Sequence, residues 1–323
     1  MKLFYIILIL AYLKIKHHNL YKRRFYYFFM ITQGVLIEGF GPYSFIVEKG
    51  LAKAILPEEG NKDYYKWART KRRGFDTALE ERIKLPFESG LLVVRNPDGS
   101  IKFDDRKLRF SGYSKRGDQY VLQVAPTHFG EIKATDIRAA MSPEFEKYLL
   151  EKSLTDFGEE MAYFACSIAV NAVPITKEGY VHVFRRSDTQ ELYPGRWDVI
   201  GGFVEVGDRI FDFYEGDMSK KFAELVNYNA KKEFVEETGI DYNLFNLTGL
   251  VRGANFVFTH EAFLDMSTEE FLARFSKTGD SSEIGRVLVL KSSKELSGFL
   301  ESEKANTSPT AYHALRLHLK NRL

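Results

Sequence analysis

The chain has 323 residues, enough for about two domains of ordinary size, and its 45% hydrophobic and 28% charged residues are typical of a globular protein. The formal net charge is +2, but residues 1–30 hold six basic residues and no acidic one, so the remaining residues carry a net charge of −4. This mildly acidic body argues against a nucleic-acid partner. The single cysteine, Cys166, excludes an internal disulfide. Its apolar neighbours predict a buried structural thiol in a reducing, cytoplasmic setting.

The first 30 residues have two interpretations. Residues 3–13 are an apolar run of 11, shorter than the about 20 residues that a membrane-spanning helix needs. A basic and aromatic stretch follows, and such a segment can lie at a membrane interface. The alternative is that Met30 is the first residue of the protein. We favour this alternative, so membrane association through residues 1–30 is the less favoured expectation.

Residues 31–157 are predicted to form an N-terminal accessory domain rich in β-strands. A pair of short strands is expected around Gly41-Pro42 and a helix over residues 61–81. Residues 107–113 and 119–127 alternate in the manner of two antiparallel strands. A further helix is expected to begin at Ser142-Pro143, with proline in its first position, and to end near Lys152.

Residues 158–323 are predicted to form a second domain with strands and helices in alternation. A long β-rich run over 162–175 and a strand over 180–186 predict a hairpin that leads to the segment G-R-W-D-V-I-G-G, residues 195–202. A central helix is expected next, with a buried face formed by Phe222, Leu225, Val226 and Ala230. Two more strands are expected at residues 255–264 and 286–290, and a closing helix at residues 310–323.

Three glutamates near the end of the central helix indicate a cation site. Glu233, Glu236 and Glu237 have the spacing i, i+3 and i+4, which places them on one helical face, where like charges repel. Carboxylates in such an arrangement suit Mg²⁺, which also binds substrate phosphates. The glycine pair Gly201-Gly202 lets the backbone pass close to a ligand or metal. The alternative for the glutamates alone is an ordinary solvated face.

The glycine pair and the glutamates together resemble the signature of the Nudix hydrolases, G-x5-E-x7-R-E-U-x-E-E-x-G-U, where U is a bulky aliphatic residue. Gly202 takes the place of the first glycine, Asp208 replaces a glutamate, and Lys232 replaces an arginine. Phe234 stands at an aliphatic position. The positions that match outright are Glu233, Glu236, Glu237, Gly239 and Ile240.

The main departure from this signature is its length. Asp208 and Lys232 are separated by 23 residues where the family has seven, an insertion of 16. A surface insertion costs little free energy because loop-closure entropy grows slowly with length. Residues 210–217 are predicted to be a loop, and the rest of the insertion is predicted to extend the glutamate helix toward its N-terminus.

The resemblance implies an α/β fold, the family's α/β/α sandwich around a mixed sheet, preceded here by a smaller β-rich α+β domain. It implies Mg²⁺, with Mn²⁺ as the alternative ion, held by Glu233, Glu236, Glu237 and the carbonyl oxygen of Gly201. These glutamates would also be catalytic. A further glutamate often serves as base in this family, and the candidates for that role are Glu283 and Glu261, each of which is alternatively an ordinary carboxylate.

The substrate expectation comes from a wider resemblance. A β-rich N-terminal part and an insertion inside the box are similar to the Nudix branch that hydrolyses UDP-glucose and UDP-galactose to UMP and sugar 1-phosphate. This resemblance implies that Thr127, Phe129 and Thr135 lie near the nucleoside. The alternative is that these residues serve only in packing and helix capping. Gly202 and one of Arg185 and Arg186 would contact the substrate, with the arginine on a phosphate.

Other functions remain open at this stage. One is hydrolysis of ADP-ribose or a dinucleotide by the same site. Another is a non-catalytic nucleotide-binding Nudix module, and a third is a membrane-anchored scaffold that depends on residues 1–30. RNA decapping is disfavoured because no basic and aromatic stripe flanks the box. The oligomeric state is not predicted.

Overall fold

The protein is described here from a computed structural model. Several predicted features lie outside the residues that it describes: residues 1–30, the helix at 61–81, Asp208 and Glu283. The described residues are 35–39, 45–49, 106–116, 119–190, 192–206, 217–241, 245–253, 255–278 and 284–322.

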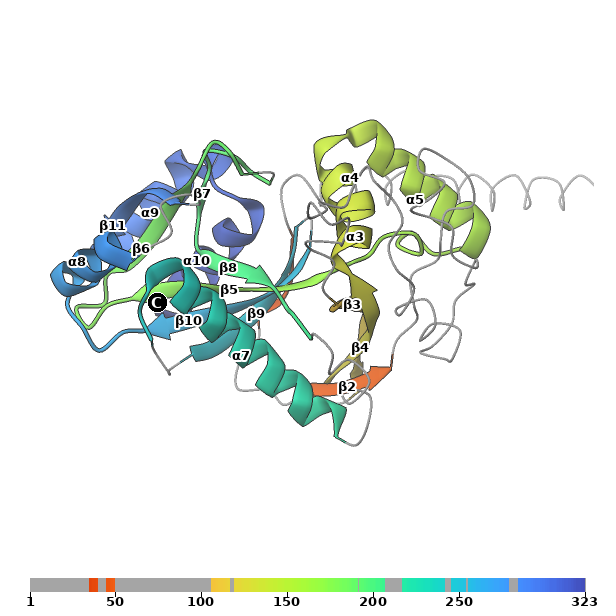
Figure 1. Cartoon of the computed structure of the whole chain (residues 1–323), viewed down its shortest axis with the longest axis horizontal. Coiled ribbons are helices and arrows are strands. Elements are labelled where there is room, and N and C mark those ends of the chain that lie inside the picture. The colour runs from red at the N-terminus through yellow and green to blue at the C-terminus, as the bar shows by residue number, and fades with distance from the viewer. Residues whose placement is uncertain are drawn as a thin grey trace, which may run out of the picture.

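The larger of two sheets is mixed and has the strand order β1-β9-β10-β5-β6-β11, with β8 paired to β5 and β7 paired to β6 (Figure 1). β5 and β10 run parallel, and the other pairs are antiparallel. The strands are β1 (Val35–Gly39), β5 (Ile168–Ile175), β6 (Val181–Arg186), β7 (Trp197–Asp198), β8 (Ile200–Phe203), β9 (Phe245–Arg252), β10 (Phe256–Phe263) and β11 (Ile284–Leu290).

Helices cover both faces of this sheet because its strands are apolar on both sides. On one face Ala172 packs with residues of α7 (Met218–Thr238) and α8 (Thr268–Thr278). On the other face its neighbour Val173 packs with residues of α9 (Ser293–Ser302) and α10 (Pro309–Arg322). The predicted α/β/α sandwich around a mixed sheet is confirmed.

The smaller sheet has the order β2-β4-β3 and lies beside the larger one in Figure 1, with helix α5 nearby. β3 (Arg106–Arg116) and β4 (Gln119–His128) form the predicted antiparallel pair. The two strands predicted around Gly41-Pro42 are present as β1 and β2 (Phe45–Lys49), but they do not pair with each other, because β2 runs parallel to β4 whereas β1 joins β9. Each of the two lies at the edge of a different sheet.

A short helical run connects the small sheet to the sandwich. It comprises α3 (Phe129–Ile132), a π-helix (Lys133–Ile137), α4 (Arg138–Met141) and α5 (Pro143–Phe157). Ser142 caps α5, since its hydroxyl accepts from the Phe145 N–H, and Pro143 takes the first position as predicted. The helix runs past Lys152 and ends at Gly158, whose φ of 68° suits glycine.

Strand β5 begins later than predicted, at Ile168, and Asp136 binds the two residues before it. The buried Asp136 carboxylate accepts hydrogen bonds from the N–H groups of Cys166 (3.2 Å) and Ser167 (3.0 Å). Cys166 itself is buried, as predicted, but it has a φ of 48° and lies before the strand. Burial raises the pKa of Asp136 to about 6, although these N–H groups oppose the shift.

The predicted domain boundary after residue 157 stays a prediction. One buried cluster contains side chains from both sides of it, including Leu108, Leu149, Val170 and Phe258. The Phe110 N–H also donates to the Cys166 carbonyl at 2.8 Å. Within the described part of the chain, no helix is long and apolar enough to cross a membrane.

Candidate active site

Strand β8 carries the glycine pair at a place where side chains would not fit. Gly201 lies opposite Asn171 of β5, and Gly202 lies opposite Val170. A Cβ atom on Gly201 would overlap the carbonyl oxygen of Val170, and one on Gly202 would overlap the carboxylate of Glu233. Gly201 is therefore required by the close approach of the backbone, whereas a side chain at Gly202 would displace the Glu233 carboxylate of the predicted metal site.

Helix α7 brings that glutamate to the glycines. The helix begins after Asp217, whose Oδ1 accepts from the Lys220 N–H at 3.0 Å, and ends at Gly239, which has a φ of 69°. The second half of the insertion extends it N-terminally, as predicted. Its inward residues, among them Phe222, Val226, Ala230 and Phe234, are buried, and Glu233 and Glu237 follow them along the same side of the helix, at its C-terminal end beside β8.

The three glutamates have different surroundings. Glu237 Oε1 accepts a hydrogen bond from the Gly201 N–H at 3.3 Å, and Glu233 packs against Gly202. Burial raises the pKa of Glu233 to about 7, and the nearby charge of Glu236 adds to the shift while Lys232 opposes it. Glu236 is 55% exposed in its side chain, and its Oε1 lies 3.7 Å from Lys232 Nζ.

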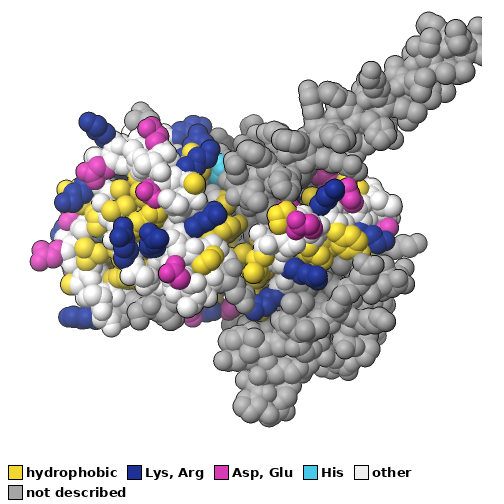
Figure 2. Space-filling view, turned by 90° about the horizontal axis from the view of Figure 1, so that it is seen from above, with side chains coloured by type: hydrophobic (Ala, Val, Ile, Leu, Met, Phe, Trp, Pro, Cys, Tyr) yellow, Lys and Arg dark blue, Asp and Glu magenta, His cyan; other side chains and the backbone are white. Residues whose placement is uncertain are grey.

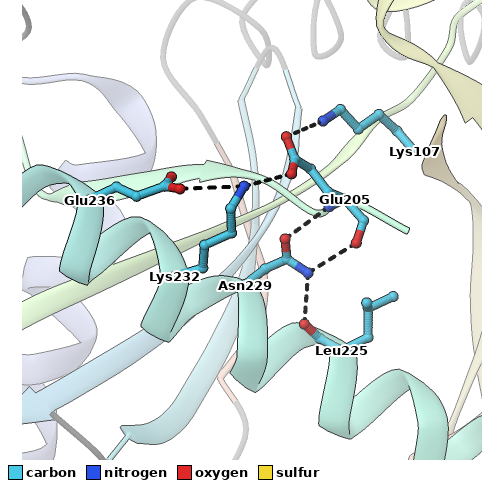
Figure 3. Close-up of polar contacts among 6 residues, drawn as sticks. All are labelled: Lys107, Glu205, Leu225, Asn229, Lys232 and Glu236. Atoms are coloured by element: carbon cyan, nitrogen blue, oxygen red, sulfur yellow. Dashed lines mark hydrogen bonds and ion pairs between the residues drawn. The ribbon is translucent and has the colours of Figure 1, made fainter. Parts of the chain in front are cut away.

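A network that sequence analysis missed supports this end of α7 (Figure 3). Lys232 Nζ donates to Glu205 Oε2 at 2.6 Å, and Lys107 Nζ donates to Glu205 Oε1 at 2.8 Å. Burial alone would raise the pKa of Glu205, but the hydrogen bonds from the two lysines hold that pKa below its usual range. The signal was present in the sequence as an acidic residue three positions after Gly202.

Asn229 fixes the backbone of the same segment to α7. Its Oδ1 accepts from the Glu205 N–H at 3.0 Å, and its Nδ2 donates to the carbonyl oxygens of Glu205 (3.2 Å) and Leu225 (2.9 Å). Asn229 is completely buried. The segment after the glycine pair is thus held from two sides, by a helix of the sandwich and by Lys107 of β3.

The donors at the glycine pair suit Mg²⁺, which prefers carboxylate and carbonyl oxygens. Glu233 and Glu237 contact consecutive residues of β8, and the missing side chain of Gly202 leaves the space that the Glu233 carboxylate fills. Among the residues described, no three acidic, histidine or cysteine side chains are already gathered around one point. A cation would therefore be held by carboxylates that turn toward it, and the exposed Glu236 has room to do so.

An open pocket of about 120 Å³ adjoins the glycine pair. Arg186 lines it, and Nη1 of Arg186 donates to Asp198 Oδ2 at 3.0 Å while Nη2 donates to Gln190 at 3.1 Å. Arg185 is exposed and its guanidinium lies 5.9 Å from the centre of the Trp197 ring. Of the two arginines predicted to contact the substrate, Arg186 is the one at the pocket.

The remaining predicted site residues lie farther out. Thr127 is buried and its hydroxyl donates to Glu131 at 2.6 Å. Phe129 makes an edge-on contact with Phe203, which lines the pocket, at 5.8 Å between ring centres. The roles of Thr127 and Phe129 at a nucleoside stay predictions.

Thr135 and Glu261 take part in contacts within the fold. The Thr135 hydroxyl donates to the Glu131 carbonyl at 2.7 Å. Glu261 is buried, and its Oε1 lies 2.7 Å from Nδ1 of His318 in α10, on the face of the sheet opposite α7. The structure therefore does not bring Glu261 together with the three glutamates of α7.

No known protein-family pattern matches the chain, and no curated protein matches it. Solved structures are similar to it. A protein from Deinococcus radiodurans is 17% identical with a TM-score of 0.32, over 46% of this chain and 81% of that one. A MutT protein from Methanosarcina mazei is 15% identical with a TM-score of 0.33, over 49% of this chain and 96% of that one. A Nudix hydrolase from Nitrosomonas europaea is 12% identical with a TM-score of 0.31, over 48% of this chain and 89% of that one. At these values the likeness concerns the fold alone.

Proposed function

We propose that the protein is a Mg²⁺-dependent pyrophosphohydrolase that cleaves a nucleoside diphosphate linked to another group. The substrate is a UDP-sugar, and the products are UMP and sugar 1-phosphate. One observation carries the proposal: Glu233 and Glu237 of α7 meet Gly202 and Gly201 of β8 beside an open pocket. Carboxylates and a strand carbonyl oxygen at the edge of a pocket can hold a cation against a bound diphosphate.

The acidic and basic side chains at the site have different roles. Glu233, Glu236 and Glu237, with the Gly201 carbonyl, would hold the ion, and Arg186 would face the substrate. Mg²⁺, where bound, supplies Lewis-acid polarisation of the phosphoryl oxygens. Water adds to one phosphorus, the bridging P–O bond breaks, and a carboxylate takes the proton that the water loses.

The choice of a UDP-sugar is supported by the N-terminal part of the chain. The similar Nudix branch has a β-rich N-terminal part and an interrupted box, and here Lys107 of β3 contacts Glu205 directly after the glycine pair. The N-terminal sheet is thus attached to the segment that would hold the metal. A nucleic-acid substrate is disfavoured by the net charge of −4 outside residues 1–30, and on the face in Figure 2 basic side chains are scattered among acidic and apolar ones.

A substrate panel tests the proposal and its alternatives. UDP-glucose, UDP-galactose, ADP-ribose, a diadenosine polyphosphate and NADH are each incubated with Mg²⁺ or with EDTA, followed by phosphatase and phosphate detection. We expect Mg²⁺-dependent release from the UDP-sugars alone. Phosphate release from ADP-ribose or the dinucleotides alone would show that the substrate is not a UDP-sugar. No phosphate release from any compound would favour a non-catalytic binding module.

A further inference from the structure

Asn171 is a buried polar residue in the middle of an apolar strand. It is 4% exposed, lies opposite Gly201, and lines the pocket next to the glycine pair. Neither its Oδ1 nor its Nδ2 has a hydrogen-bond partner, although both atoms are buried. Buried amides in folded proteins are nearly always paired, so this exception calls for a partner that enters from outside the fold.

The backbone around Asn171 is firmly placed. Its carbonyl oxygen lies 3.1 Å from His260 Nδ1, and its strand is bordered by β8 on one side and β10 on the other. The missing side chain of Gly201 keeps the space beside Asn171 free, since a Cβ atom there would meet Asn171. Asn171 thus lines the pocket from a rigid support.

A second unpaired group lines the same pocket. Arg186 uses Nη1 and Nη2 for Asp198 and Gln190, but its buried Nε has no partner. Because Asp198 neutralises the guanidinium, these two residues together add no net charge to the pocket. Most of the other lining is apolar, including Val170, Val199 and Phe203.

These features point to a neutral, hydroxylated ligand rather than to a phosphate. A carboxamide offers one acceptor and two donor hydrogens, and Nε offers one more donor. A hydroxyl both donates and accepts, so two adjacent hydroxyls can satisfy Oδ1 and Nδ2 together. A phosphate would leave Oδ1 unpaired, since it has only acceptors at neutral pH.

We propose that Asn171 determines specificity by binding a pair of adjacent sugar hydroxyls of the substrate. The inference rests on the proposed function for its substrate class. A UDP-sugar carries such hydroxyls on two rings, the ribose and the hexose, and each ring is linked directly to one end of the diphosphate. The pocket shares Gly201 and Gly202 with the glutamates, so a sugar in it lies next to a diphosphate at the metal site.

Calorimetric binding in EDTA tests this inference independently of catalysis. The probes are UDP-glucose, its analogue with 2′,3′-dideoxyribose, and UDP-2-deoxyglucose. We expect wild-type protein to lose about tenfold or more in affinity for one of the two deoxy analogues, in line with two lost hydrogen bonds for the dideoxyribose compound or one for the deoxyglucose compound. Loss with the first assigns the pocket to the ribose, and loss with the second assigns it to the hexose.

Asn171→Leu is the decisive variant, with exposed Asn227→Ala as the control. We expect Asn171→Leu to bind UDP-glucose about tenfold or more weakly and to bind the discriminated analogue as wild type does. Its melting temperature should be equal or higher, because an unpaired buried amide is removed. Equal affinity of wild type for all three probes, no binding of any, or strong destabilisation by Asn171→Leu would each overturn the inference. The substrate panel with Mg²⁺ measures hydrolysis by the wild-type protein, so it tests the proposed function separately from these binding experiments.

Discussion

Lys107 of the N-terminal sheet and Glu205 beside the glycine pair form an ion pair with 2.8 Å between Nζ and Oε1. The other oxygen of Glu205 accepts from Lys232, one residue before Glu233 on α7. One carboxylate therefore connects two parts of the chain that lie on opposite sides of the insertion and of the predicted domain boundary. The predicted metal site is supported by residues from both parts.

Replacing Lys107 tests this support. Lys107 is 4% exposed in its side chain, so Lys107→Met keeps most of the packing but removes one partner of Glu205. We expect a loss of about 1–3 kcal/mol in the free energy of unfolding, measured by urea denaturation, because a part-buried carboxylate loses a charged hydrogen bond. We also expect lower activity.

Lys220→Met is the matched control for Lys107→Met. Its partner Glu224 is 4.0 Å away, and both side chains are mostly exposed. Such surface pairs contribute little to stability, so this variant should change unfolding by less than about 0.5 kcal/mol. Equal effects of the two variants would show that the Lys107 to Glu205 contact has no special role.

Gly202→Ala tests the contact between β8 and the glutamate helix. The new Cβ would overlap the Glu233 carboxylate, so we expect the glutamate to be displaced, with a loss of about 100-fold or more in Mg²⁺-dependent turnover. Stability should change much less than activity, because the new Cβ meets only the carboxylate end of a flexible side chain. Gly298→Ala in α9, where a Cβ meets nothing within 4 Å, is the control and should be neutral or stabilising. Wild-type turnover in Gly202→Ala would contradict the site.

Glu146 predicts a pH dependence of stability. It is buried in α5, its Oε1 has no hydrogen-bond partner, and burial raises its pKa to about 7, with Arg252 opposing the shift. In the unfolded chain its pKa is near 4.5. As pH rises from 4.5 to 7, the unfolded state loses the proton first, so the folded state becomes less stable by up to about 3 kcal/mol.

Glu146→Gln isolates this effect. The variant keeps the shape of the protonated side chain but cannot ionise. We expect its stability relative to wild type to rise between pH 4.5 and pH 7 and then to stay constant, as followed by thermal or urea unfolding at several pH values. A difference between the two proteins that does not change with pH would contradict the raised pKa of Glu146.

Much of the sandwich could be predicted because its signals are local. The spacing of Phe222, Val226 and Ala230 indicated the extension of α7 through the insertion, and the structure confirms it. The Ser142-Pro143 cap was likewise predicted and observed. Such features depend on residues within one or two turns of each other, and sequence periodicity reports them directly.

The features that were missed depend on contacts between distant residues. The pairing of β1 with β9 joins segments about 210 residues apart, and the clamp of Asp136 on Cys166 and Ser167 shortens a strand that composition alone would lengthen. Asn171 carried no motif, and the position of Glu205 three residues after Gly202 did not report its two lysine partners. Their importance became visible only when β5, β8 and α7 were placed together.

The most direct test of the account follows UDP-glucose by phosphorus NMR with wild-type protein and with Glu237→Gln. Glu237 accepts from the Gly201 N–H, and glutamine keeps the shape of the side chain while removing its charge. We expect conversion to UMP and glucose 1-phosphate by wild type in Mg²⁺, none in EDTA, and a rate about 100-fold or more lower for a folded Glu237→Gln variant. Turnover by Glu237→Gln at the wild-type rate, or turnover by wild type in EDTA, would contradict the assignment of α7 and the glycine pair as a metal-dependent active site.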